Sequence, residues 1–332
     1  MERISFDWPT LERLRSKFLN PDGIEGSYWK SKEDLEQYHI SFGKRISWKW
    51  SALWEELKNL GWQPEGKTLL DWGCGSGIAT LSFLEAFGAD GLESIILWDH
   101  STLACQFAQQ HIGELHPHLA VEVRSIESTD PKLADTICLA SHVLNELSND
   151  ERETLSSTFG LARQIIWVEP GDYESSHLLG VQRERLAERM RIVAPCVCQE
   201  SCPMFLEDNA RHWCHFFARS PIEAFTDPDW ARFATMLEID LRSLPYSYLV
   251  LNSKDCKVIG AEPTYSRVIG KPRQYKGYTK ALSCDSQGLR DLELQKRDDG
   301  KLWKTMKKGR NGSLYKWNEL NNGRIKQGES VF

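Results

Sequence analysis

Long hydrophobic runs are missing from this sequence of 332 residues. No uninterrupted apolar stretch approaches the roughly 18 residues that a membrane-spanning helix needs. The segment Met1–Asn20 has no apolar core and carries three acidic residues, so it resembles neither a signal peptide nor an acid-poor transit peptide. Internal repeats and low-complexity tracts are missing as well. We therefore expect a cytoplasmic protein without a membrane segment.

Charge is unevenly distributed along the chain, whose net charge is −6. Residues 261–332 hold 16 Lys and Arg against 8 Asp and Glu, a balance of +8, and the remainder carries −14. A basic region on an acidic body indicates a directed contact with an anionic partner. The alternative is a solvated β surface, because lysines on edge strands also deter aggregation. Aromatic residues in the same region favour nucleic acid as the partner.

A glycine-rich turn is the most informative segment. The short apolar strand Thr68–Leu70 leads into Asp71, and glycine then occupies every second position, at Gly73, Gly75 and Gly77. Glycine at these positions lets the backbone approach a bulky ligand, and Asp71 can accept a hydrogen bond from a ligand ammonium group. This D-x-G-x-G-x-G pattern resembles motif I of class I methyltransferases that bind S-adenosylmethionine (SAM). A nicotinamide site is a poorer fit, because G-x-G-x-x-G has a different spacing.

A second acidic residue supports a nucleoside site. The next expected strand, Ser94–Trp98, ends at Asp99. In a doubly wound sheet an acid at this position reaches the ribose hydroxyls of an adenosine ligand. The remaining alternative is a glycine turn that holds no ligand.

Strands and helices alternate over residues 66–175, which predicts βαβ units and a parallel sheet. We expect strands at Thr68–Leu70, Ser94–Trp98, Ala120–Val123, Thr136–Ala140 and Gln164–Val168. The predicted organisation is a helical cap over 1–65, a methyltransferase-like α/β domain over 66–260 with a metal-binding insertion at 190–220, and a basic β-rich extension over 261–332. In that extension, Asp298-Asp299-Gly300 between two apolar runs predicts a β-hairpin.

Four of the nine cysteines lie within 19 residues: Cys196, Cys198, Cys202 and Cys214. An odd total in a cytoplasmic chain disfavours a disulfide framework. Their spacing is wider than that of the usual zinc pairs, whereas an iron–sulfur cluster tolerates it with a distant fourth thiolate. An iron–sulfur site is therefore the leading hypothesis, with zinc and a metal-free loop as alternatives.

Several segments together resemble one family, the small-ribosomal-subunit Rsm-type family numbered twenty-two, which includes relatives of the mitochondrial methyltransferase-like protein seventeen. The likeness runs from about residue 47 to residue 308. It rests on Glu169-Pro170-Gly171, Val193-Ala194-Pro195-Cys196, Ser201-Cys202-Pro203, Trp213-Cys214-His215-Phe216 with Arg219, Arg267-Val268-Ile269-Gly270-Lys271-Pro272-Arg273, and Ser283-Cys284-Asp285.

The resemblance implies a class I methyltransferase (Rossmann-like) fold that carries a 4Fe–4S cluster and acts with the small ribosomal subunit and its ribosomal RNA in ribosome assembly or translation. It also implies the cluster ligands Cys196, Cys202, Cys214 and Cys284. Only the resemblance selects Cys284, which is about 70 residues from the others. Cys198 departs from the family pattern, so the choice between Cys196 and Cys198 stays open.

The usual catalytic signatures are absent. The Asn/Asp-Pro-Pro-Tyr loop of amino-methyltransferases is replaced by a segment with His142 and Glu146, and no cysteine after the fifth strand suits cytosine-C5 chemistry. His142 or Glu146 could act as a base, or the segment could cap the following helix. Two functions therefore compete: a SAM-dependent RNA methyltransferase, or a non-catalytic ribosome assembly factor that keeps the SAM and metal sites for structure or sensing.

The basic C-terminal region predicts the RNA-binding surface. We expect phosphate contacts from Arg267, Lys271, Arg273, Lys304, Lys307, Lys308 and Arg310, with base stacking on Trp303, Tyr315 or Trp317.

Overall fold

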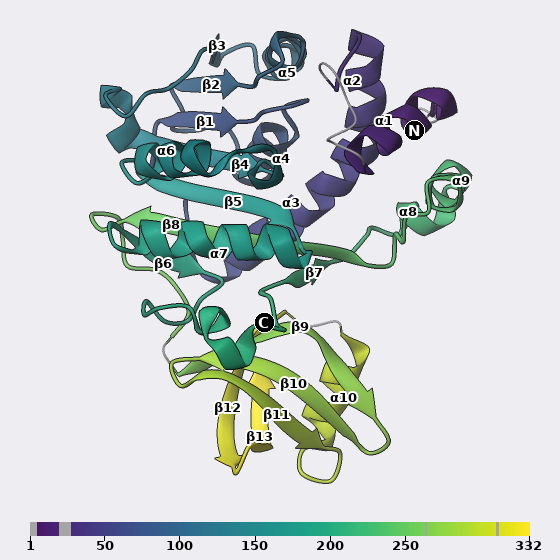
Figure 1. The fold of residues 1–332 in the computed structure, drawn as a ribbon, viewed down its shortest axis with the longest axis vertical. Coiled ribbons are helices and arrows are strands. Elements are labelled where there is room, and N and C mark those ends of the chain that lie inside the picture. The colour runs from purple at the N-terminus through teal and green to yellow at the C-terminus, as the bar shows by residue number, and fades with distance from the viewer. Residues whose placement is uncertain (1–4, 20–27, 263, 310–311) are drawn as a thin grey trace. The chain divides into compact units, whose positions relative to one another are not determined.

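Two structural units make up the chain, and each is assembled from three separated segments (Figure 1). The first unit comprises residues 1–54, 64–141 and 218–244, and the second comprises residues 55–63, 142–217 and 245–332. The computed structural model describes residues 5–19, 28–262, 264–309 and 312–332. No helix among these residues is both long and apolar enough to cross a membrane.

The first unit contains four parallel strands in the order β3-β2-β1-β4. Their bounds are β1 Thr68–Trp72, β2 Ser94–Trp98, β3 Ala120–Val123 and β4 Thr136–Ser141. The helices between them are α4 Ile78–Phe87 and α5 Thr102–Leu115, with the 3₁₀ turn η3 Pro131–Asp135 before β4. The predicted βαβ series and parallel pairing are confirmed here.

Burial explains why the inner strands β1, β2 and β4 are mainly apolar. The three inner strands are almost fully buried, as expected when helices cover a parallel sheet on its faces. Each buried Leu or Ile contributes about 1.5–3 kcal/mol. Strand order and connections together give an α/β fold with a Rossmann-like sheet, in which the carboxyl ends of β1 and β2 are neighbours.

The other helices of the first unit come from its first segment, residues 1–54, and its last segment, residues 218–244; α3 runs on into the second unit. Their bounds are α1 Trp8–Leu19, α2 Lys32–Tyr38, the π-helix η2 His39–Gly43, α3 Lys44–Asn59, α8 Glu223–Thr226 and α9 Pro228–Met236. Tryptophans anchor α3: Trp50 Nε1 donates to Ser141 Oγ at 3.1 Å, and Trp54 Nε1 donates to Ser82 Oγ at 3.0 Å. These bonds satisfy the indole N–H groups of rings that are otherwise packed in the core.

The second unit has a sheet of antiparallel strands and a barrel. In the sheet, β8 Leu244–Ser253 pairs with β5 Gln164–Pro170, β6 Met190–Ala194 and β7 Phe216–Ala218. The helices are α6 Asn149–Phe159 and α7 Tyr173–Ala187, with short 3₁₀ turns η4 Leu144–Glu146, η5 Pro203–Phe205 and η6 Glu207–Asn209. The capping hypothesis for His142 and Glu146 is wrong, because Ser148 and Glu151 form the capping box of α6.

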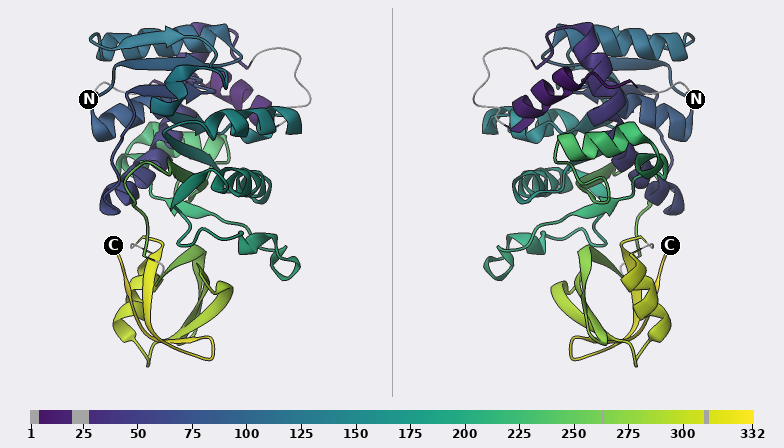
Figure 2. Two further views of the ribbon diagram at one scale, coloured as in Figure 1. Left: turned by 90° about the vertical axis from the view of Figure 1, so that its left-hand side faces the viewer. Right: turned by 90° about the vertical axis from the view of Figure 1, so that its right-hand side faces the viewer.

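The C-terminal region is a closed five-stranded barrel in the order β10-β11-β13-β12-β9. Its strands are β9 Tyr265–Tyr275, β10 Tyr278–Asp285, β11 Gly288–Gln295, β12 Leu314–Asn321 and β13 Arg324–Ser330. Helix α10, Gly300–Lys308, lies along the barrel, as both views of Figure 2 show. Closure removes the unpaired edges that an open sheet would expose.

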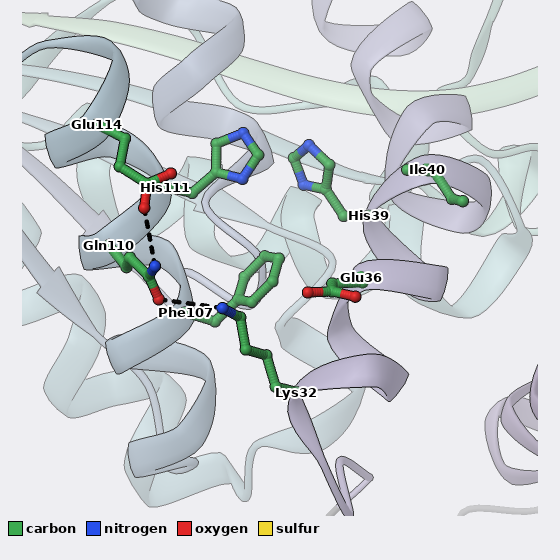
Figure 3. Close-up of a pocket in the computed structure, with 8 residues that line it drawn as sticks. All are labelled: Lys32, Glu36, His39, Ile40, Phe107, Gln110, His111 and Glu114. Carbon is green, nitrogen blue, oxygen red and sulfur yellow. Dashed lines mark hydrogen bonds between the residues drawn. The ribbon is translucent and has the colours of Figure 1, made fainter. Parts of the chain in front are cut away.

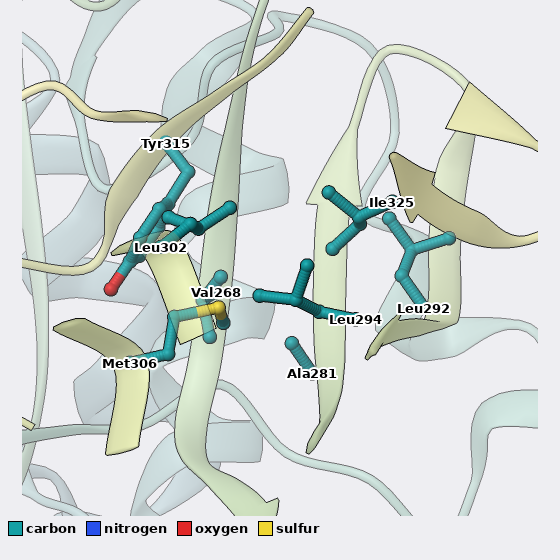
Figure 4. Packing of buried hydrophobic residues seen from close by; sticks show 8 residues of the cluster. All are labelled: Val268, Ala281, Leu292, Leu294, Leu302, Met306, Tyr315 and Ile325. Atoms are coloured by element: carbon teal, nitrogen blue, oxygen red, sulfur yellow. The ribbon is translucent and has the colours of Figure 1, made fainter. Parts of the chain in front are cut away.

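The hairpin predicted at residues 298–300 is wrong, because α10 begins there. Asp299 caps the helix by accepting a hydrogen bond from Leu302 N at 2.9 Å. Leu302 and Met306, one turn apart, then reach the apolar centre of the barrel, where Leu302 lies by Tyr315 and Met306 by Val268 (Figure 4). The local Asp-Gly signal is shared by turns and helix starts, and the contact of Leu302 and Met306 with the barrel interior decides for the helix.

Candidate functional site

The glycine turn after β1 is built for close approach. Gly73, Gly75 and Gly77 all have positive φ, of 72°, 51° and 76°. A left-handed backbone at three alternate positions is what glycine alone adopts without strain. The N–H groups of Gly73 and Cys74 both donate to Trp98 O, at 2.8 and 3.0 Å, so the turn folds back over the end of β2.

An added Cβ distinguishes the roles of the glycines. At Gly77 it would lie 3.2 Å from Ala108 and from Ile112, so this glycine permits close packing of the turn on α5. At Gly75 an added Cβ would meet no heavy atom within 4 Å. The space in front of Gly75 is therefore open to a ligand, in agreement with the predicted role of this position.

Asp71 is a fully buried carboxyl group with one unsatisfied oxygen. Asp71 is 0% exposed to solvent. Oδ2 accepts from Thr80 Oγ1 at 2.7 Å and from Thr80 N at 3.2 Å, whereas Oδ1 has no hydrogen-bond partner. Burial raises the pKa of Asp71 to about 7. A buried acceptor without a donor is costly in a folded protein and indicates a missing partner.

Asp99 holds the glycine turn. Its Oδ2 accepts from Gly75 N at 2.9 Å, and its Oδ1 accepts from Ser101 N at 2.8 Å at the start of α5. Burial raises the pKa of Asp99. The structure thus brings Asp71, Asp99 and Gly75 to one edge of the β1–β2 pair, where the sequence analysis expected them.

A pocket that the sequence analysis did not foresee lies between α2, η2 and α5 (Figure 3). It measures about 210 Å³ and contains two facing imidazoles, His39 and His111, with ring centroids 4.8 Å apart. His39 Nδ1 lies 3.1 Å from the Oγ of Ser76, a residue of the glycine turn. Burial and the nearby His111 lower the pKa of His39 to about 4. No spacing rule in the sequence links α2 to α5, so the pocket could not be predicted.

The predicted metal ligands gather within the second unit. The pKa of the Cys214 thiol is raised well above its usual range by burial and by the neighbouring thiols of Cys196, Cys202 and Cys284. Burial, and after it the thiols of Cys196, Cys202 and Cys198, raises the pKa of Cys284. Burial, and after it the Cys196 thiol, raises the pKa of Cys202 to about 11 and that of Cys198 to about 11. Cys284, distant in sequence, thus joins the cysteine-rich loop in space.

The thiols are not arranged around a single ion. Among the described residues, no group of three or more His, Cys, Asp or Glu is positioned to hold one metal ion. The structure therefore does not confirm the predicted metal site, although it brings its cysteines together. The other four cysteines, Cys74, Cys105, Cys138 and Cys256, are buried.

The segment after β4 is tied to a buried glutamate. Glu169 is 0% exposed, and its Oε1 accepts from Val143 N, Leu144 N and Trp167 Nε1 at 3.1, 3.3 and 2.7 Å. Burial raises the pKa of Glu169 to about 7, and its Oε2 has no partner. His142 has a φ of 59°, rare for a residue with a side chain.

Several residues expected to bind RNA have other roles. Arg267 is only 2% exposed and Tyr315 only 4%, so neither can contact a phosphate or a base, and that part of the prediction is wrong. Trp317 donates to Ser283 Oγ at 3.0 Å and stacks on Tyr315. Lys304, Lys307 and Lys308 are exposed on α10. Arg310 lies outside the described residues.

Comparison with solved structures gives distant likenesses. One is a magnesium protoporphyrin IX methyltransferase from Synechocystis PCC 6803 with bound SAM, at 12% identity over 76% of this chain and 100% of that chain, with a TM-score of 0.39. Another is a SAM-dependent methyltransferase from Aquifex aeolicus, at 17% identity over 51% of this chain and 93% of that chain, with a TM-score of 0.38.

Comparison with curated proteins finds no match. The sequence model of one family, described as mitochondrial small ribosomal subunit Rsm22, matches residues 44–316, which is most of the chain. This match extends from the start of α3 through the glycine turn, the cysteine-rich loop and most of the barrel. The protein with these features belongs to the mitochondrial small ribosomal subunit Rsm22 family.

Proposed function

We propose that this chain is a SAM-binding, methyltransferase-like protein that works with the small ribosomal subunit and its RNA. The observation that carries the SAM assignment is the unpartnered Oδ1 of Asp71 at the end of β1. The ammonium group of SAM would supply the missing donor, and a cationic donor suits a carboxylate in a buried site. Gly75 would allow the ligand to approach the turn, and Asp99 retains lone pairs for the ribose hydroxyls.

Titration calorimetry with SAM and S-adenosylhomocysteine tests this assignment. Gly75→Val should abolish binding, because its side chain would fill the open space in front of the turn. Gly91→Val is the matched control, since Gly91 also has a positive φ of 87° and an open Cβ position but lies in the turn before β2. A wild-type protein that binds neither compound would refute the proposal.

The family assignment supports the ribosomal part of the proposal. Its description names the mitochondrial small ribosomal subunit, and the exposed lysines of α10 offer a surface for RNA phosphates. Co-sedimentation of the purified protein with small subunits tests the association directly. Failure to co-sediment, with SAM binding intact, would refute the proposed small-subunit partner without refuting the proposed SAM site.

We further propose that Cys196, Cys202, Cys214 and Cys284 hold a 4Fe–4S cluster. A donor set made only of thiols suits zinc or an iron–sulfur cluster. A tetrahedral zinc site, with Zn–S near 2.3 Å, brings its sulfurs within about 3.8 Å of each other. The four thiols lie near enough for Cys196 and Cys202 to raise the pKa of both Cys214 and Cys284, and the thiolates of a 4Fe–4S cluster bind separate irons. When bound, the cluster would supply structural cross-linking or redox sensing.

Metal analysis distinguishes an iron–sulfur cluster from a zinc site. Protein prepared anaerobically from iron-replete cells should contain about four irons per chain, and Cys202→Ser or Cys214→Ser should lose them. Cys256→Ser is the control, because Cys256 is a buried cysteine whose thiol contacts the Arg163 carbonyl. Stoichiometric zinc without iron would replace the cluster with a structural zinc site.

A non-catalytic factor is the second candidate function, and the segment after β4 favours it. Its backbone N–H groups at Val143 and Leu144 are engaged by the buried Glu169, which closes the turn around an internal carboxyl group. An assay for transfer of the labelled methyl group from SAM to small-subunit RNA decides between a methyltransferase and a non-catalytic factor. His142→Ala and Glu146→Ala test the candidate bases of an active enzyme, and no transfer with SAM bound would establish the non-catalytic function.

A further inference from the structure

Two buried arginines flank the cysteine site, and the first is Arg267 on β9. Its Nε donates to Pro195 O at 2.8 Å, directly before Cys196. In the barrel register, Arg267 stands opposite Cys284 on β10. A single side chain thus joins the backbone before one proposed ligand to the strand that carries another. Its charge is paired with Glu56 at 2.7 Å.

The second is Arg183 on α7, which is 4% exposed. Its Nη2 donates to the carbonyl oxygens of Cys198 and Glu200, and its Nη1 pairs with Glu184. The same Glu184 accepts from Cys202 N at 3.0 Å. The Arg183–Glu184 dipeptide therefore holds the loop that contains Cys196 and Cys202 at three backbone positions.

Each arginine also retains a buried nitrogen without a partner: Nη2 of Arg267 and Nε of Arg183. Burial of a charged group is unfavourable even when the group is paired, and an unsatisfied buried donor adds a further penalty. Pairing with Glu56 and Glu184 therefore leaves part of this cost unexplained. Both side chains bind the backbone on either side of Cys196, Arg267 at Pro195 O and Arg183 at Cys198 O, so the cysteine site is their common neighbour.

We propose that Arg183 and Arg267 are positioning residues of the four-cysteine site, which hold its loop and strand in place and give it a positive potential that stabilises a negatively charged thiolate-bound group. This inference rests on the cluster proposed above. Loss of a nearby positive charge disfavours the more negative, reduced state of such a group, so the reduction potential should become more negative. Loss of a nearby negative charge should have the opposite effect.

The sharpest test compares the shifts in reduction potential, which should have opposite signs for loss of a positive and loss of a negative charge. In anaerobically prepared protein, Arg267→Met should lower the midpoint potential by at least a tenfold change in the reduction equilibrium, about 59 mV for one electron. Glu56→Gln should raise the potential, because it removes the carboxylate paired with Arg267. Arg183→Met should lower it, and Arg267→Lys should restore most of the shift. Arg324→Met, which breaks the Arg324–Asp298 pair elsewhere in the barrel, is the matched control.

Iron content per chain is the second readout. We expect Arg183→Met and Arg267→Met to lose at least half of their iron during gel filtration, while Arg267→Lys, Glu56→Gln and Arg324→Met retain it. If Arg267→Met does not fold, the potentials of Arg183→Met and Glu56→Gln still carry the test. Shifts of the same sign in these two variants, or none in either, would overturn the inference. A wild-type protein without iron would instead refute the cluster itself.

Discussion

The carboxylate of Asp99 accepts a hydrogen bond from the backbone N–H of Gly75 at 2.9 Å, joining the end of β2 to the middle of the glycine turn. A hydrogen bond to a charged group contributes about 1.5–3 kcal/mol. We expect Asp99→Ala to weaken SAM binding at least tenfold, because it frees the turn and removes an acceptor for the ribose. Calorimetry measures the change. Glu122→Ala, which removes a surface ion pair on β3, should leave binding unaltered.

The buried Asp71 makes SAM binding depend on pH. Its pKa is raised to about 7, and an ammonium group requires the deprotonated carboxylate, so the Asp71 proton must leave before the ligand binds. Affinity should therefore increase up to tenfold per unit between about pH 5.5 and 7. Calorimetry in buffers of different ionisation enthalpy detects the released proton. Constant affinity over this range would contradict the role of Asp71, and Asp71→Asn should abolish the dependence.

Glu169 should govern the pH dependence of stability in the second unit. Its pKa rises from an ordinary value of 4.5 to about 7 on burial. For a raised folded pKa, the stabilisation is fully present below about pH 4.5 and is lost as the pH rises through about 7. The neutral variant Glu169→Gln should match the wild type near pH 4 and be more stable near pH 8, by about 3 kcal/mol at most. Urea unfolding at both pH values checks this. Equal differences at both would show that Glu169 is not buried as a neutral acid.

Two glycines of β9 and its following turn separate steric from conformational effects. Gly270 and Gly277 both have positive φ, of 67° and 85°, so alanine is strained at either by about 1–2 kcal/mol. A Cβ at Gly270 would also lie 2.9 Å from His215 Nε2, whereas at Gly277 it meets nothing within 4 Å. Gly270→Ala should therefore lower the free energy of unfolding clearly more than Gly277→Ala. Equal losses in thermal or urea unfolding would mean that His215 moves aside freely.

Local signals explain which parts of this fold could be predicted. The glycine turn, Asp71 and Asp99 follow from strand ends and backbone geometry that a short segment encodes by itself. The segment at 298–300 encodes two local outcomes equally well, and only the contact of Leu302 and Met306 with the barrel selects the helix. Short-range patterns therefore fail where the deciding contact lies far away in the sequence.

Arg267 illustrates the same limit for the site. A basic residue in a basic region predicts an exposed phosphate contact, yet tertiary pairing with Glu56 makes it one of the most buried large side chains. Neither the local pattern around Arg267 nor the one around Glu56 records that pairing, because the two residues lie far apart in the sequence. The pocket around His39 and His111 is hidden from the sequence for the same reason.

The lysines of α10 remain the best candidates for RNA phosphate contacts, and the helix explains why. With Leu302 and Met306 turned into the barrel, Lys304, Lys307 and Lys308 are left exposed on the outside. Phosphate contacts release counterions, so affinity for small-subunit RNA should fall steeply as salt increases.

Changing these three lysines to Glu should weaken binding to all RNA sequences and flatten the dependence of log affinity on log salt by roughly one for each phosphate that is no longer neutralised. Filter binding at several salt concentrations measures both. Lys132→Glu, on the first unit, is the control, because Lys132 is paired with Glu122 there. SAM affinity should stay unchanged in the triple variant, since the lysines and the glycine turn belong to different units. Wild-type salt dependence in the triple variant would show that α10 is only a solvated surface, and that another face of the protein binds the RNA.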